Sequence, residues 1–220
     1  MWAMARRGRA TTLQVASWTL GCLLLGVAAV PAQADSVRSK QWHLDAMHAD
    51  EMWESSTGKG VTVAVIDTGV DATLPDLQGQ VLPGKDFSGQ AGGAHADSAN
   101  HGTQMAALIA GTGKRSGESG AFGLAPGSKI LPLRVDDGAQ AKNEAENAQQ
   151  FSATVSSAIR YAAETDARIL SISMGNQKES PEIQEAVRYA LGKGKMILVL
   201  QPEILRVGDG WDRLVAGPRL

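Results

Sequence analysis

One run of apolar residues constrains the fold of this chain more than any other feature. Val61–Ile66 is almost entirely apolar and rich in β-branched side chains, which is typical of a strand buried on both faces of a parallel sheet. Asp67 therefore falls at the carboxyl end of that strand, the edge where open α/β sheets bind ligands. Thr68 and Gly69 predict a tight turn that leaves the carboxylate facing the ligand crevice. The sequence thus predicts an acidic group at a binding edge.

A histidine lies 34 residues after Asp67, at the start of a second apolar segment. The spacing of apolar residues after His101 predicts a buried helix, and Gly102 allows a close approach of backbone to this point. A helix amino end disfavours the imidazolium ion, so His101 stays neutral and able to accept a proton unless a carboxylate partners it. Either residue alone is more often structural, as a turn former or a hydrogen-bonding group; the two together indicate an acid–base pair.

The rest of the chain alternates between helical and extended patterns, which predicts an α/β fold with right-handed crossovers between parallel strands. Segments 111–120 and 136–150 are polar or rich in glycine, and we expect surface loops there, the second one mobile. The expected helices span about 44–53, 102–110, 151–165 and 181–191, and the expected strands span 61–67, 129–135, 168–172 and 195–199.

Several motifs between about Gln41 and about Val199 resemble those of the subtilisin-like serine peptidases of family S8. The motifs are V-A-V-I-D-T-G-V at Val63–Val70, N-H-G-T at Asn100–Thr103, G-L-A-P at Gly123–Pro126 and I-L-S-I-S-M-G at Ile169–Gly175. Within that family the chain most resembles the mycosins, which are peptidases associated with type VII secretion in actinobacteria. This narrower resemblance rests on Gln41–Leu44, Leu82–Phe87 and His101–Gly113.

The resemblance implies a partial subtilisin-like fold, a parallel sheet flanked by helices, and a role for each site residue. Asp67 would orient His101, which would act first as general base and then as general acid in hydrolysis of a polypeptide substrate. Ser171, Ser173 and Gly175 would belong to the strand whose backbone pairs with an extended substrate. The resemblance also implies a type VII secretion apparatus as partner.

No organic cofactor is expected, and no metal site is predicted. Calcium is common among proteins of this kind, but the acidic residues here form no calcium-binding loop and are expected to serve turns and solvated surface. These acidic residues are Asp71, Asp76, Asp86 and Asp97.

The resemblance stops near Val199. The family continues with Ala-Ala-Gly-Asn, whose Asn supports the oxyanion, and later with Gly-Thr-Ser, which carries the nucleophile; neither follows here. One choice of codons for Val199–Ile204 spells Ala-Ala-Ala-Gly-Asn in a shifted frame, so residues 200–220 are interpreted as an out-of-frame or aberrant tail. The sequence is thus expected to be incomplete before the catalytic serine and to have negligible peptidase activity. We expect the missing part to include the membrane anchor of a full-length mycosin.

The first 34 residues are predicted to be a signal peptide. Basic residues at Arg6, Arg7 and Arg9 precede an apolar run over about 18–30, and Ala32-Gln33-Ala34 offers a cleavage site. An uncleaved membrane anchor is the alternative, but the run is short for a span. We therefore expect export through the plasma membrane to the extracellular space or cell envelope, leaving a peptidase domain over 35–199.

Two other functions fit parts of the sequence. The Asp67-Thr68-Gly69 segment also resembles the loop of an aspartic protease, but a second such loop is missing from the sequence, so that chemistry would need a dimer. A noncatalytic secreted protein that binds peptide along Ser171–Gly175 is the other alternative. Nucleic acid is not an expected partner, since 21 basic and 23 acidic residues leave a net charge of −2 without a basic cluster outside the signal region.

Overall fold

The computed structural model describes residues 37–114, 120–136, 138, 140–175 and 180–199. The chain divides into two units, Met1–Ala34 and Asp35–Leu220, and every described residue belongs to the second. The predicted signal peptide and the predicted out-of-frame tail, 200–220, both lie outside the described residues.

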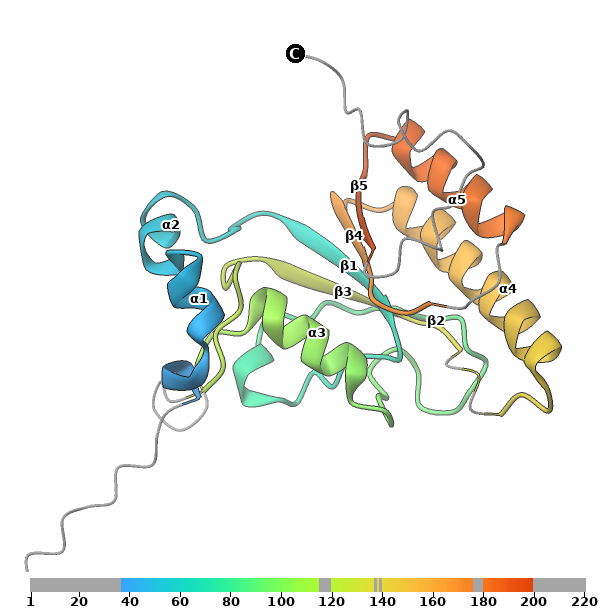
Figure 1. Ribbon diagram of the computed structural model, residues 1–220, viewed down its shortest axis with the longest axis horizontal. Helices are drawn as coiled ribbons and strands as arrows, with labels where there is room; N and C mark the ends of the chain where they lie inside the picture. The colour runs from blue at the N-terminus through green and yellow to red at the C-terminus, as the bar shows by residue number, and fades with distance from the viewer. Residues whose placement is uncertain (1–36, 115–119, 137, 139, 176–179, 200–220) are drawn as a thin grey trace, which may run out of the picture. The chain divides into compact units, whose positions relative to one another are not determined.

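The described strands form one parallel sheet, which confirms the predicted α/β fold (Figure 1). The strand order is β2-β3-β1-β4-β5, with β1 in the centre. Val65 of β1 lies beside Pro132 of β3 on one side and beside Ser171 of β4 on the other. The strands are β1 (Thr62–Asp67), β2 (Lys85–Asp86), β3 (Lys129–Arg134), β4 (Ile169–Ile172) and β5 (Met196–Val199).

Helices cover both faces of β1, as its apolar sequence predicts. Val63 and Val65 pack in one core cluster with residues of α3 (His101–Ala110). Ala64 and Ile66 point to the other face and join the cluster built by α4 (Glu144–Ala163) and α5 (Pro181–Gly192). Figure 1 shows α3 apart from the α4–α5 pair, with the sheet between them. Asp67, the last residue of β1, is held by packing on both sides.

The path of the chain creates a switch in direction beside β1. From β1 the chain crosses to β3 on one side, and it later returns through α4 to β4 on the other side. In open α/β sheets, ligands bind outside the carboxyl ends of the strands at such a switch point. Here that point lies at the ends of β1 and β4, where Asp67 and the Ser173–Gly175 segment are found.

Some predicted boundaries were wrong. The single helix expected over 44–53 is two helices, α1 (Trp42–Ala46) and α2 (Ala49–Ser55), because His48 between them adopts a left-handed backbone with φ of 53°. Part of the loop expected over 136–150 is helical, because α4 begins at Glu144, where Asn143 accepts a hydrogen bond from the Glu146 N–H at 2.9 Å. The short strand β2 and the 3₁₀ turns η1 (Arg38–Lys40) and η2 (Pro75–Leu77) were not predicted.

Candidate active site

Asp67 lies fully buried at the carboxyl end of β1, where its carboxylate accepts hydrogen bonds. Its Oδ1 accepts the backbone N–H of Thr68 at 2.7 Å and lies 2.8 Å from Nδ1 of His101. Within the described residues, the second carboxylate oxygen, Oδ2, is buried without a hydrogen-bond partner. The geometry concentrates the hydrogen bonding of this carboxylate on the oxygen that faces the imidazole.

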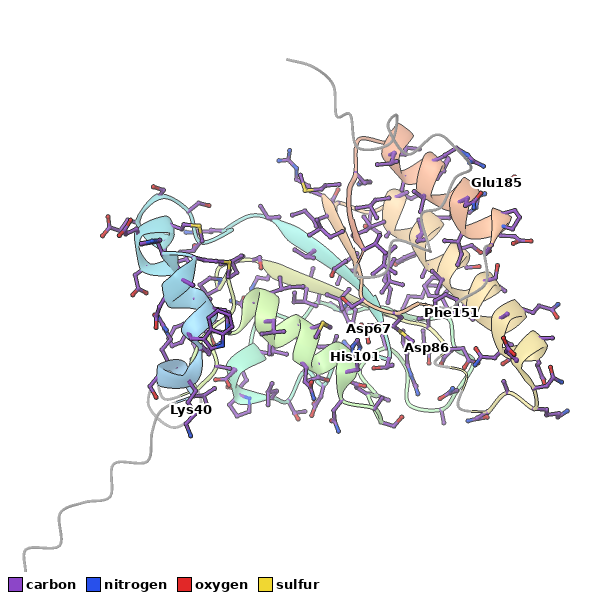
Figure 2. The ribbon with its side chains drawn as sticks, in the orientation of Figure 1. Lys40, Asp67, Asp86, His101, Phe151 and Glu185 are labelled. Atoms are coloured by element: carbon purple, nitrogen blue, oxygen red, sulfur yellow. The ribbon has the colours of Figure 1, made fainter. Side chains whose placement is uncertain are left out.

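His101 is the first residue of α3, as the sequence predicts. Figure 2 shows its side chain beside Asp67. Because an ionised carboxylate can only accept, the contact places the ring proton of a neutral imidazole on Nδ1 and leaves a lone pair on Nε2. The His101 side chain is 40% exposed while that of Asp67 is 1% exposed. Among the described residues no side chain hydrogen-bonds to Nε2, so this nitrogen can accept a proton from outside.

Two glycines allow close backbone contacts around the end of β1. A methyl group on Gly102 would lie 2.1 Å from the carbonyl oxygen of Gly69 and 3.1 Å from Oδ1 of Asp67. Gly69 has a φ of 118°, and a methyl group there would lie 2.2 Å from the carbonyl oxygen of Ala96. Only glycine fits such contacts. Gly102 therefore lets the start of α3 approach the end of β1, and Gly69 lets the turn after β1 approach Ala96.

The turn after Asp67 also holds the first turn of α3 through side chains. Thr68 Oγ1 accepts the backbone N–H of Gly102 at 3.1 Å. Asp97 accepts the Thr68 hydroxyl on one oxygen and the backbone N–H of Thr103 on the other. These bonds satisfy donors that a helix start otherwise leaves unpaired.

The acidic residues expected on turns and solvated surface have different environments. Asp71 does cap a turn, since its Oδ1 accepts the N–H and the hydroxyl of Thr73 at 2.8 and 2.7 Å. The Thr73 hydroxyl, and next its N–H, hold the pKa of Asp71 below its usual value. Asp76 lies in the 3₁₀ turn η2, which agrees with the expected turn, but it is 3% exposed and so does not lie on the solvated surface. Asp97 is half-buried within the hydrogen-bond network of the site, a role that the sequence did not indicate.

The three residues expected to bind substrate fall in two environments. Ser171 lies inside β4, between Val65 of β1 and Leu198 of β5, so it has no free backbone edge for a substrate. Ser173 and Gly175 follow the end of β4, and their backbones make no backbone hydrogen bond with other described residues. The expectation of substrate pairing therefore has to be corrected at Ser171 and stays a prediction for Ser173 and Gly175.

The described residues contain no group of three or more His, Cys, Asp or Glu side chains placed to hold a metal ion. None of the described helices combines the length and apolar character needed to cross a membrane.

Comparison with known proteins finds a matching family model and several relatives of this chain. The model of the subtilase family, peptidase S8, matches residues 58–200. The major intracellular serine protease of Bacillus subtilis is 34% identical over 169 residues, which cover 75% of this chain and 49% of that protein. Mycosin-1 of Mycobacterium tuberculosis is 39% identical over 160 residues, covering 66% of this chain and 35% of that protein.

The fold has matching solved structures as well. The MycP3 protease from the type VII (ESX-3) secretion system superposes with a TM-score of 0.59 at 31% identity, over 71% of this chain and 44% of that one. The chain thus spans about half, or less, of the length of these relatives.

Proposed function

The chain belongs to the subtilase family, and on that basis we propose that it provides the acid–base pair of a serine endopeptidase. One observation carries the proposal: the buried Asp67 carboxylate meets Nδ1 of His101 at 2.8 Å, while the His101 side chain is 40% exposed and its Nε2 has no hydrogen bond to another described residue. An orienting carboxylate, an imidazole and an open proton-accepting nitrogen are the parts that activate a serine hydroxyl.

The chemical step assigned to the pair is hydrolysis of a peptide bond through an acyl-enzyme. As a serine oxygen attacks the carbonyl carbon, its proton moves to Nε2 of His101, and Asp67 stabilises the imidazolium that forms. Nε2 then gives this proton to the leaving amine nitrogen as the carbon–nitrogen bond breaks. A water molecule repeats the sequence, and its proton passes through Nε2 to the serine oxygen when the acid product leaves. No cofactor enters these steps.

For the 220 residues by themselves, the proposal is peptide binding with negligible cleavage. No nucleophilic serine is assigned within this sequence, and the acid–base pair cannot form an acyl-enzyme alone. The Ser173–Gly175 segment supports binding, because its backbone groups lie at the switch point without backbone partners among the described residues. Main-chain pairing with an extended peptide requires no nucleophile.

The proposed setting is the cell envelope of a bacterium with a type VII secretion system. Support comes from the likeness to Mycosin-1 and to the MycP3 protease from the type VII (ESX-3) secretion system. The basic and apolar pattern before Ala34 supports export of the chain. Amino-terminal sequencing of the protein from culture medium and envelope fractions tests this directly: a chain beginning at Asp35 agrees with the proposal, and a retained Met1 contradicts it.

The catalytic proposal is tested on the gene together with the protein. DNA is sequenced through the codons for Val199–Leu220 and beyond, and the chain is expressed in whichever frame contains a downstream Gly-Thr-Ser. This protein should hydrolyse a fluorogenic peptide and react with a fluorophosphonate probe. In related serine peptidases loss of the histidine lowers kcat by roughly a million-fold, so His101→Ala should abolish both signals. His95→Ala, which removes an exposed histidine, is the matched control and should retain them.

Two results would contradict these proposals. Hydrolysis that survives in His101→Ala would remove this residue from the chemistry. If the DNA holds no Gly-Thr-Ser in any frame, catalysis is withdrawn and peptide binding by the 220 residues remains the function to measure. Binding of a fluorescent extended peptide should then weaken in Ser173→Pro, which lacks the backbone donor; equal binding by this variant would rule out strand pairing.

A further inference from the structure

Asp97 contacts both elements that carry the acid–base pair. Its Oδ1 accepts the hydroxyl of Thr68, the residue after Asp67, at 2.7 Å. Its Oδ2 accepts the backbone N–H and the hydroxyl of Thr103, two residues after His101, at 2.8 and 2.5 Å. One carboxylate therefore bridges the end of β1 and the first turn of α3.

The bond to Thr68 decides where a single hydroxyl proton goes. Thr68 Oγ1 lies 2.7 Å from Oδ1 of Asp97 and 3.3 Å from Oδ1 of Asp67. A hydroxyl has one proton to donate, and the shorter contact assigns it to Asp97. Without that acceptor, the proton would turn to Asp67 Oδ1, the oxygen that already holds the His101 ring. Asp97 thus keeps a competing donor away from the Asp67–His101 hydrogen bond.

The bond to Thr103 replaces an ordinary helix cap. Asn100 at the cap position of α3 has a left-handed backbone, with φ of 58°, and its side chain makes no capping hydrogen bond. The N–H of Thr103 is capped by Asp97 instead, and the N–H of Gly102 by Thr68. Because a negative charge near a helix amino end is favourable, Asp97 sets where α3, and therefore His101, begins.

The segment that carries Asp97 is itself fixed. The buried guanidinium of Arg134 donates to the carbonyl oxygen of Ala91 at 2.9 Å and to Gln90 Oε1 at 3.0 Å. The N–H of Val70 donates to the carbonyl oxygen of Ala94 at 3.1 Å. The segment that leads to Asp97 is therefore held in place by Arg134 and Val70.

We propose that Asp97 is a positioning residue of the acid–base pair, which removes the Thr68 hydroxyl proton from Asp67 and fixes the start of α3. It touches neither His101 nor substrate; it acts through Thr68 and Thr103. The inference rests on the proposed function, since it concerns the same pair. It predicts a hydrogen-bonding effect at His101 that depends on the Thr68 hydroxyl.

The test is ¹⁵N NMR of the histidine rings in the 220-residue chain and in five variants of it. In the wild type, His101 should show the Nδ1–H tautomer and an Nδ1 proton protected from solvent exchange. Asp97→Asn leaves one acceptor oxygen and turns an NH₂ group toward donors on the other side of the bridge. It should therefore mix the two tautomers and raise the exchange rate of this proton about tenfold, the effect of losing one ordinary hydrogen bond. Thr68→Val removes the competing hydroxyl together with the acceptor of the Gly102 N–H, so the double variant is compared with Thr68→Val alone. In the Thr68→Val background, Asp97→Asn should raise the exchange rate much less than it does in the wild type.

The matched control is Asp71→Asn. Asp71 also binds the N–H and the hydroxyl of one threonine, Thr73, so its variant loses the same charge and the same type of cap. The tautomer and exchange rate of His101 should not change in Asp71→Asn. If Asp97→Asn loses the folded spectrum, Thr103→Val takes its place: it retains the charge of Asp97 and the bond from the backbone N–H of residue 103, removes the bond from the Thr103 hydroxyl and should also raise the exchange rate.

The outcomes separate this inference from the proposed function. A wild-type chain without a protected Nδ1 proton at His101 would contradict the acid–base pair itself. A protected proton that is unchanged in Asp97→Asn, or in Thr103→Val where that variant is needed, would overturn the role of Asp97 alone. If Asp97→Asn raises the exchange rate by the same factor in the wild type and in Thr68→Val, the role of Asp97 at the Thr68 hydroxyl is overturned, because the effect would then pass through Thr103 alone.

Discussion

Adding one methyl group at Gly102 should disrupt the acid–base pair. In Gly102→Ala the new Cβ would lie 2.1 Å from the carbonyl oxygen of Gly69 and 3.0 Å from Cβ of Asp67. Because the nearest of these contacts is with backbone, the start of α3 must move away from β1 by about 1 Å, and misplacement of this size can lower a catalytic rate about a hundredfold. Overpacking of this kind costs about 1–3 kcal/mol of folding free energy.

Gly192→Ala is the matched control, since Gly192 ends α5 and a methyl group there meets no atom within 4 Å. Alanine is favoured over glycine in helices by up to about 1 kcal/mol. Urea denaturation should therefore show Gly102→Ala to be about 1–4 kcal/mol less stable than Gly192→Ala. The protected Nδ1 proton of His101 should be lost in the first variant and retained in the second. Equal stability of the two variants, with the His101 signal intact in both, would refute the close contact between β1 and α3.

Three further changes test the fold around the site. Ile66→Ala removes a fully buried side chain from the core facing α4 and α5, and urea denaturation should show a loss of about 2–5 kcal/mol. Asn143→Ala removes the α4 cap and should cost about 1 kcal/mol in the same assay; no loss would mean that the cap does not stabilise the helix. Thr73→Val removes the main cause of the lowered pKa of Asp71. Because the folded-state pKa lies below the ordinary 3.8, the wild type should be more stable than this variant above that pH, and the difference should vanish as pH falls through the folded-state value; a difference independent of pH would contradict this.

The sequence predicted those parts of the site in which a short motif shows both a reactive side chain and the end of a strand or helix. The apolar run before Asp67 places this acid at a strand end, and the apolar spacing after His101 places the base at a helix start; the structure has both there. Gly102 was expected to allow close backbone approach, and its contact with Gly69 confirms this. These features follow from local sequence patterns. The elements that the patterns predict form as expected because the core buries both of them.

The features that were missed depend on contacts distant in sequence or on weak local signals. Asp97 is of a residue type common in turns, so the sequence around it indicated only a turn. Its hydrogen bond to Thr68, 29 residues away, leaves no recognisable pattern in the sequence around either residue. His48 adopts its left-handed backbone without a glycine to mark it. One signal was available: Asn143 followed three residues later by Glu146 resembles a capping box, and it marks the true start of α4.

The strand order has a consequence for synthesis of the chain. The contacts that build the acid–base pair all lie between β1 and the end of β3, residues 62–134. At a translation rate of 5–20 residues per second, the stretch from there to the end of β5 takes about 3–13 s to make. The base can therefore meet its carboxylate before α5 and β5 are made. During those seconds Ala64 and Ile66, which α4 and α5 later cover, present an apolar face on the nascent chain, and a chaperone has its earliest target there.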